Sequence, residues 1–160
     1  MAFDAFLQLT GADGESKDSA LSGQIQLQSF SFGASNSGSA SHGTGMGTGK
    51  SQMQDFSFIP TMDKATPKLF LFCANGKHID KGVLSVQKSG GDKMVFYKTT
   101  FSDILVSSFT CSGGGGDDLP HVSVTFNFTK IEMEYTPQNQ DGSKGGAVLA
   151  GWDVKANTKA

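Results

Sequence analysis

The chain has 160 residues and a formal net charge of −2, and all 13 of its basic residues are lysine. This length fits one domain over residues 1–160, with a core large enough to fold without a disulfide or a metal. The lack of arginine and of a basic stripe argues against nucleic-acid binding. The sequence contains no run of eighteen apolar residues, so it predicts no membrane-spanning helix.

The first half of the chain predicts strands, beginning at residues 2–9. In two further segments the apolar side chains alternate with polar ones and then shift phase by one residue, which is typical of a bulged or strongly curved strand. The residues that carry these shifts are Ile25, Leu27, Phe30 and Phe32 in one segment and Met53, Phe56 and Phe58 in the other.

A long stretch between these two segments, residues 33–49, consists almost wholly of Gly, Ser, Ala and Thr. Compact domains seldom contain so long a structureless loop unless it has a function. The stretch has too little apolar surface to fold on itself. We therefore expect an extended arm at residues 34–48 that becomes ordered against a neighbouring molecule.

One short helix is predicted at residues 66–75. Thr66 is expected to cap it, Pro67 suits the first helical position, and Gly76 suits a left-handed stop. The helix is apolar on nearly every side, so we expect it to plug an open end of the sheet. Phe70 and Phe72 are both predicted to be core residues.

The second half of the chain predicts strands at residues 83–88, 93–101, 104–111 and 148–155, with a hairpin turn at 90–92. Another long strand begins at Val122 and shifts phase near Thr129 and Lys130. The predicted fold is therefore mainly β, an antiparallel two-sheet barrel or sandwich with one short flanking helix and a long Gly/Ser-rich loop.

The motifs of common catalytic and binding sites are mostly absent. Residues 43–51 end in Gly-Lys-Ser, but a phosphate-binding loop requires glycine where this chain has Thr44, and a strand-like pattern follows instead of a helix. Asp117, Asp118 and His121 are better explained as a charged turn than as metal ligands. We therefore expect no enzyme activity, no cofactor and no metal.

The two cysteines, Cys73 and Cys111, lie far apart in the sequence and form neither a redox pair nor a zinc pattern. Buried free thiols in a reducing compartment are the expected state. The opening residues lack the basic and apolar regions of a secretory signal.

The whole sequence resembles the Hcp proteins, the haemolysin-coregulated proteins of bacterial type VI secretion systems. The resemblance starts with Met-Ala-Phe-Asp-Ala-Phe and continues in order over nearly the entire chain. The further segments that carry it are Gly14-Glu15-Ser16, Gln54-Asp55-Phe56-Ser57-Phe58, Asp63-Lys64-Ala65-Thr66-Pro67-Lys68-Leu69, Cys73-Ala74-Asn75-Gly76-Lys77-His78, Leu105-Val106-Ser107-Ser108 and Gly151-Trp152-Asp153.

The resemblance implies a structural subunit that forms homo-hexameric rings. Such rings stack into a tube, which a contractile sheath propels out of the cell with a spike protein at its tip, and the lumen carries and protects small effector proteins. The implied partners are the spike, the sheath, the baseplate and the effectors, with no membrane insertion. The protein would be made in the bacterial cytoplasm, exported without a signal peptide, and secreted or delivered into target cells.

The resemblance also assigns roles to particular residues. A small polar residue on the second strand faces the lumen in the family, which corresponds to Ser31 here. The long loop forms the ring-to-ring contact, and it corresponds here to Ser35, Asn36, Ser37, His42, Thr44, Met46 and Thr48.

Two alternative functions, each from a different class of protein, remain open. One is a monomeric β-sandwich that binds a ligand such as carbohydrate through Asp117, His121 and exposed aromatics, although 13 Phe against one Trp and two Tyr favour buried aromatics. The other is a hydrolase built on Cys111, His121 and Asp117, which would have a reactive thiol.

Overall fold

The computed structural model describes residues 2–37, 50–90 and 93–160. Within them the chain forms ten strands and one helix. They are β1 (Phe3–Leu9), β2 (Ile25–Ser31), β3 (Ala34–Asn36), β4 (Ser51–Met53), β5 (Phe56–Pro60), α1 (Thr66–Asn75), β6 (Ile79–Lys88), β7 (Val95–Ser112), β8 (His121–Tyr135), β9 (Val148–Asp153) and β10 (Thr158–Lys159).

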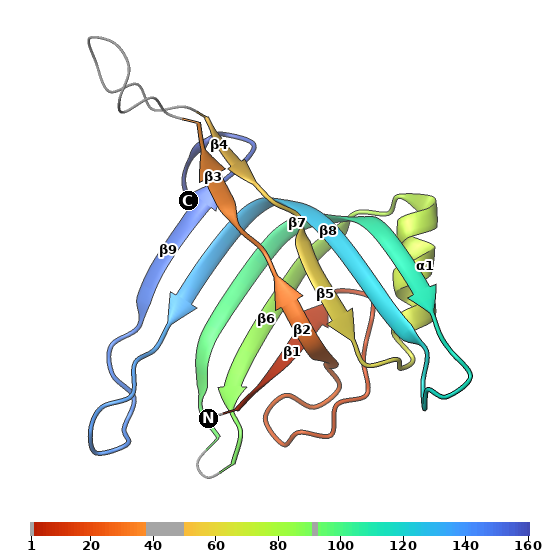
Figure 1. Cartoon of the computed structure of the whole chain (residues 1–160). Coiled ribbons are helices and arrows are strands. Elements are labelled where there is room, and N and C mark those ends of the chain that lie inside the picture. The colour runs from red at the N-terminus through yellow and green to blue at the C-terminus, as the bar shows by residue number, and fades with distance from the viewer. Residues whose placement is uncertain (1, 38–49, 91–92) are drawn as a thin grey trace.

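Six of the strands close into a barrel in the order β8-β5-β2-β1-β6-β7, because β7 pairs with β8 as well as with β6. β9 and β10 extend the sheet beyond residues 130–135 of β8, and we call this extension the wing. In Figure 1 the wing and α1 lie on opposite flanks of the barrel. The expected mainly β barrel with one short helix is confirmed.

Phenylalanine dominates the centre of the barrel. The Phe56 side chain is fully buried, and its ring centroid lies 4.9 Å from that of Phe101 and 5.0 Å from that of Phe126. These three rings come from β5, β7 and β8, so aromatic packing ties together strands that are distant in the sequence.

The two longest strands, β7 and β8, bend together at facing positions. Phe128 and Ile131 are both buried, which confirms the phase shift expected near Thr129. The pairing keeps one register across the bend, from Ser102↔Lys130 to Ile104↔Phe128, because both strands shift at the same place. Asp103, at the bend in β7, has a φ of 51°. The two strands predicted at residues 93–101 and 104–111 are therefore one bent strand.

The other phase shifts have two different outcomes. β2 has a register shift against β5 between Leu27 and Ser29, as a bulged strand requires. Met53 and Phe56, in contrast, belong to different strands, β4 and β5. β3 and β4 pair as a separate two-stranded sheet, which projects from the barrel (Figure 1). Ala34–Asn36 is thus a strand, and the expectation of an entirely featureless arm is wrong for these residues.

The helix begins and ends as predicted, with Gly76 in the left-handed region at a φ of 66°. Thr66 is inside the helix and Ala65 precedes it, so the predicted threonine cap is wrong. Phe72 is buried, but Phe70 is 57% exposed, so only one of the two expected core residues lies in the core. No helix among the described residues is long and apolar enough to span a bilayer.

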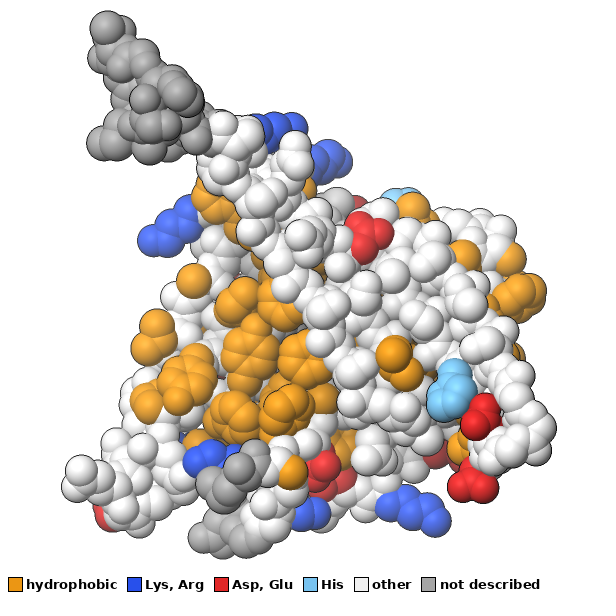
Figure 2. All heavy atoms as spheres, in the orientation of Figure 1, with side chains coloured by type: hydrophobic (Ala, Val, Ile, Leu, Met, Phe, Trp, Pro, Cys, Tyr) orange, Lys and Arg blue, Asp and Glu red, His pale blue; other side chains and the backbone are white. Residues whose placement is uncertain are grey.

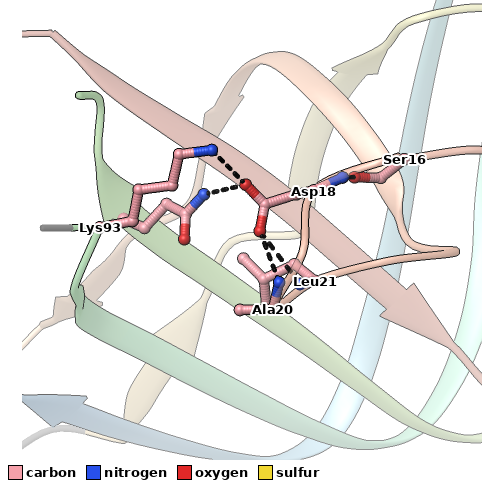
Figure 3. A network of polar contacts seen from close by, with 6 residues as sticks. Ser16, Asp18, Ala20, Leu21 and Lys93 are labelled. Carbon is pink, nitrogen blue, oxygen red and sulfur yellow. Dashed lines mark hydrogen bonds and ion pairs between the residues drawn. The ribbon is translucent and has the colours of Figure 1, made fainter. Parts of the chain in front are cut away.

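The loop that joins β1 to β2 is tied to the barrel through Asp18 (Figure 3). One carboxylate oxygen accepts hydrogen bonds from Gln87 Nε2 at 2.7 Å and Lys93 Nζ at 3.1 Å, and the other accepts from the backbone N–H groups of Ala20 and Leu21. The hydrogen bond from Gln87, followed by the backbone and lysine donors, lowers the pKa of Asp18 from 3.8 to about 2.

We expect Asp18→Asn to lower the urea midpoint of unfolding at pH 7. Because the pKa of Asp18 is lower in the folded state, its stabilisation is complete above the unfolded value of 3.8 and is lost as the pH falls through about 2. The difference from wild type should therefore shrink between pH 4 and pH 2. Asp118→Asn, at an exposed loop position, is the control and should match wild type. A difference that stays constant down to pH 2 would contradict this role.

Candidate functional site

A row of small hydroxyl side chains crosses the outer face of the barrel. Cross-strand pairing places Ser31 opposite Ser57, Ser57 opposite Thr125, and Thr125 opposite Ser108. Because directly paired residues point to the same side of a sheet, these four side chains share one face. We call this row, from β2, β5, β8 and β7, the hydroxyl row.

Local alternation turns the hydroxyl row outward. The neighbours of Ser57, Phe56 and Phe58, are buried in the barrel, as are the neighbours of Thr125, Val124 and Phe126. The aromatic core therefore orients the polar residues between them toward the outside. Ser31 is exposed at the end of β2.

At the β7 end of the row, Thr125 and Ser108 form a directed series of hydrogen bonds with Ser107, which precedes Ser108 in β7. Ser107 Oγ donates to Asp55 Oδ2 at 2.6 Å, so its only hydrogen is used. Thr125 Oγ1, at 2.7 Å, must then donate to Ser107, and Ser108 Oγ, at 2.6 Å, must donate to Thr125. This series of hydrogen bonds ends on the Asp55 carboxylate, which orders the hydroxyl groups without any basic side chain.

Such a face can exchange hydrogen bonds with a polypeptide while presenting little charge and little bulk. The two histidines within the described ranges lie elsewhere: His78 Nδ1 is 2.9 Å from Asp103 Oδ1, and His121 Nε2 is 3.6 Å from Asp117 Oδ2. In the described hydrogen bonds, Ser107 and Ser108 contact Asp55 and Thr125 and no histidine, so these bonds include no imidazole that could act as a general base for either serine.

The structure separates the residues of the hydrolase reading. Ser112 pairs with His121 and Cys111 pairs with Val122, so the Cys111 and His121 side chains alternate to opposite faces of the sheet. Cys111 is exposed and Cys73 is half-buried, so the expectation of two buried thiols is wrong. The described residues contain no group of three potential metal ligands.

The carbohydrate-binding reading also finds no assembled site. Trp152 pairs with Ile131 near one end of β8, whereas His121 begins the other end of that strand. The exposed aromatic residues are similarly scattered, with Phe3 on β1 and Phe70 on α1. Among the exposed aromatic residues in the described part of the chain, none therefore provides a sugar-binding platform beside Asp117 and His121.

Of the residues predicted for the arm, Ser35, Asn36 and Ser37 are exposed at the end of the β3–β4 sheet. His42, Thr44, Met46 and Thr48 lie outside the described residues. Sequence reasoning identified Ser31 but missed the other members of the row, Ser57, Thr125 and Ser108, and the Asp55 carboxylate bonded to Ser107. Alternation would have turned several of these outward, but only the strand register brings them into one row.

Comparison with known proteins gives a consistent result. Residues 6–135 match the family model described as type VI secretion system effector, Hcp. The chain is 46% identical to the protein named hcp1 of Pseudomonas aeruginosa, over the full length of both.

Solved structures agree with this match. A structure described as a type six secretion system protein superposes with a TM-score of 0.94 at 34% identity, covering 99% of this chain and all of that one. Hcp1 from Salmonella typhimurium superposes with a TM-score of 0.84 at 33% identity, covering all of both chains.

Proposed function

This chain belongs to the Hcp family of type VI secretion system proteins, and from that membership we propose that it is the subunit of a hexameric ring that stacks into the inner tube of the secretion system. The observation that carries the proposal is the hydroxyl row, which lies between two unpaired strand edges. A face of this kind suits the lining of a channel built from repeated copies.

The two edges bound the four-stranded face β2-β5-β8-β7. β1 pairs with β2 only as far as Leu27, so residues 28–31 are bonded to β5 on one side alone. β6 pairs with β7 only as far as Ile104, so residues 105–112 are bonded to β8 alone. Neither edge has a second strand among the described elements.

Unpaired edges offer backbone donors and acceptors to another chain. Because the two edges differ, one copy meets the next head to tail, and a head-to-tail contact that closes on itself makes a ring. The hydroxyl rows of all copies would then line a continuous inner surface. Stacking one ring on another does not close, so the rings form a tube.

The lining accounts for the carriage of small effector proteins. Small hydroxyl side chains leave room in the channel and bond to many different backbones, while the scarcity of charge avoids tight binding to any one surface. In this proposal Ser31 contacts the cargo.

The β3–β4 sheet forms the ring-to-ring contact. It projects from the barrel (Figure 1) and exposes Ser35, Asn36 and Ser37, and the contact continues through His42, Thr44, Met46 and Thr48. The partners of the tube are the spike, the contractile sheath, the baseplate and small effectors. The subunit is made in the bacterial cytoplasm and is exported with the tube into the medium or a target cell.

Negative-stain electron microscopy of the purified protein tests the assembly. Annular particles with an open centre and six-fold symmetry are expected. Particles of single-subunit size, with a monomeric mass in multi-angle light scattering even at high concentration, would contradict the proposal.

A substitution at Ser31 tests the lining. We expect Ser31→Gln to leave the ring intact and to reduce the amount of effector that co-purifies with tagged rings about tenfold, equivalent to about 1.4 kcal/mol of binding free energy. The larger side chain intrudes on the channel and disturbs the hydroxyl row. Mass spectrometry of the co-purified proteins measures the change.

Ser22→Gln is the matched control, because Ser22 is exposed in the loop between β1 and β2, away from the hydroxyl row. It should retain the wild-type amount of effector. Equal retention by the Ser31 and Ser22 variants would show that Ser31 does not contact cargo.

A further inference from the structure

An apolar groove opens between the foot of the β3–β4 sheet and the wing. Its cavity has a volume of about 470 Å³, and Figure 2 shows apolar side chains gathered in this hollow. No charged side chain occurs among its described lining residues. The side chains that define the groove are those of Phe32, Met53, Ile131, Met133, Ala150 and Trp152.

The apolar surface of the groove continues along one face of the wing. Ile131 pairs with Trp152, Met133 with Ala150, and Tyr135 with Val148, so all six side chains point to the same side. Met133 is 38% exposed, Tyr135 51% and Val148 65%. A continuous exposed apolar face of this kind marks a site of interaction, most often with another protein.

A second apolar surface, which we call the knob, protrudes from the other flank. It consists of Phe70 and Leu71 on α1, which are 57% and 47% exposed. The Phe70 ring packs edge-on against Phe109 of β7, with centroids 5.7 Å apart, so its position is set by the barrel. The two side chains of the knob are exposed, whereas the groove is a hollow, and Figure 1 places α1 and the wing on opposite flanks.

We propose that the knob of one copy seats in the groove of the next copy around the ring. This inference rests on the proposed ring. Its support is that each surface adjoins one of the two unpaired edges: Phe32 directly follows the free edge of β2, and Phe109 lies on the free edge of β7. Aligning the two edges therefore brings the knob of one subunit to the groove of its neighbour.

The chemistry of the groove suits this occupant. A polar small molecule would find no charged side chain there to orient it, whereas an aromatic and a leucine side chain lose water on entering it. Met53 and Met133 have flexible side chains that can adapt to the inserted ring. A symmetric contact would oppose groove to groove and leave both hollows unfilled.

Three single variants and one pair test the contact by native mass spectrometry across a concentration series. Leu71→Lys and Met133→Glu should each raise the concentration needed for half the protein to be in rings at least tenfold. The double variant with Leu71→Lys and Met133→Glu in the same chain should recover most of the lost ring stability, because the lysine of one copy attracts the glutamate of the next across the interface. Leu149→Lys is the control, since Leu149 is 56% exposed but alternates to the face of the wing opposite the groove and belongs to neither surface. Far-UV circular dichroism checks that each variant folds.

The outcomes separate this inference from the proposed function. Rings that persist in both Leu71→Lys and Met133→Glu overturn the knob-in-groove contact and leave the ring standing. Dissociation caused by Met133→Glu but not by Leu71→Lys assigns the groove to a different occupant and also overturns it. A wild-type protein that never forms rings overturns the proposed function itself.

Discussion

Replacing Phe56 by alanine is expected to lower the free energy of unfolding by about 3–5 kcal/mol, the usual cost of emptying a large aromatic site in a core. Its side chain is fully buried, and its ring contacts those of Phe58, Phe101 and Phe126. Those rings come from three strands of a closed barrel, so the surrounding structure cannot easily collapse into the cavity.

Urea denaturation followed by fluorescence or circular dichroism measures this loss, provided that variant and wild type are compared at the same protein concentration, because assembly adds to apparent stability. Phe3→Ala is the matched control, since Phe3 is 53% exposed. Its effect should stay below about 1 kcal/mol. A Phe56→Ala loss as small as that of Phe3→Ala would contradict the central role of this ring.

The Gly14→Ala variant is expected to lose about 3 kcal/mol, at the upper end of the range for overpacking. Gly14 lies against the backbone of the residues that lead into β2, where its N–H donates to Gly23 O at 2.9 Å. A Cβ at this position would come within 2.6 Å of the carbonyl carbon of Gln24 and of the Cα of Ile25, and would also clash with the Gln24 carbonyl oxygen. Backbone atoms cannot rotate away as a side chain can.

Gly115→Ala supplies the control, because a Cβ there meets no atom within 4 Å. Its unfolding free energy should stay within about 0.5 kcal/mol of wild type. Thermal and urea unfolding of both variants would measure the contrast. If the two substitutions cost the same, steric exclusion at Gly14 is not what selects glycine there.

The strands were predictable where their alternation was strong, and β8 shows why. Its apolar residues keep a period of two on either side of one shift, and each half has a face that must be buried. The break predicted between residues 101 and 104 was wrong, because Asp103 interrupts the pattern in the sequence while the chain continues through it in an unusual conformation. Pairing with both β6 and β8 holds β7 together across that point.

The helix illustrates a different limit. Pro67 and Gly76 are local signals, and they located both ends of α1. Six consecutive apolar residues, from Leu69 to Ala74, follow Lys68. The alternation of apolar and polar residues that would reveal the buried face of the helix is therefore missing. Only tertiary packing decides that Phe72 enters the core and that Phe70, whose ring contacts Phe109 of β7, remains exposed.

The candidate site was reached through family resemblance at Ser31 alone. The other members of the hydroxyl row, Ser57, Thr125 and Ser108, come from three other strands, and no short-range pattern encodes which serine lies opposite which threonine. Register depends on the bulges at residues 27–29 of β2 and 106–108 of β7, and a slip of one residue would turn the row inward.

The sequence by itself determined the mainly β class, the ends of the helix, the central apolar residues and the family, because these depend on local propensity, on period and on motifs that follow one another along the chain. The tertiary structure alone decided the closure of β7 onto β8, the hydroxyl row, and the groove and knob on opposite flanks. Each of those brings together residues that are distant in sequence, and their positions depend on strand register and close packing, which local propensity does not specify.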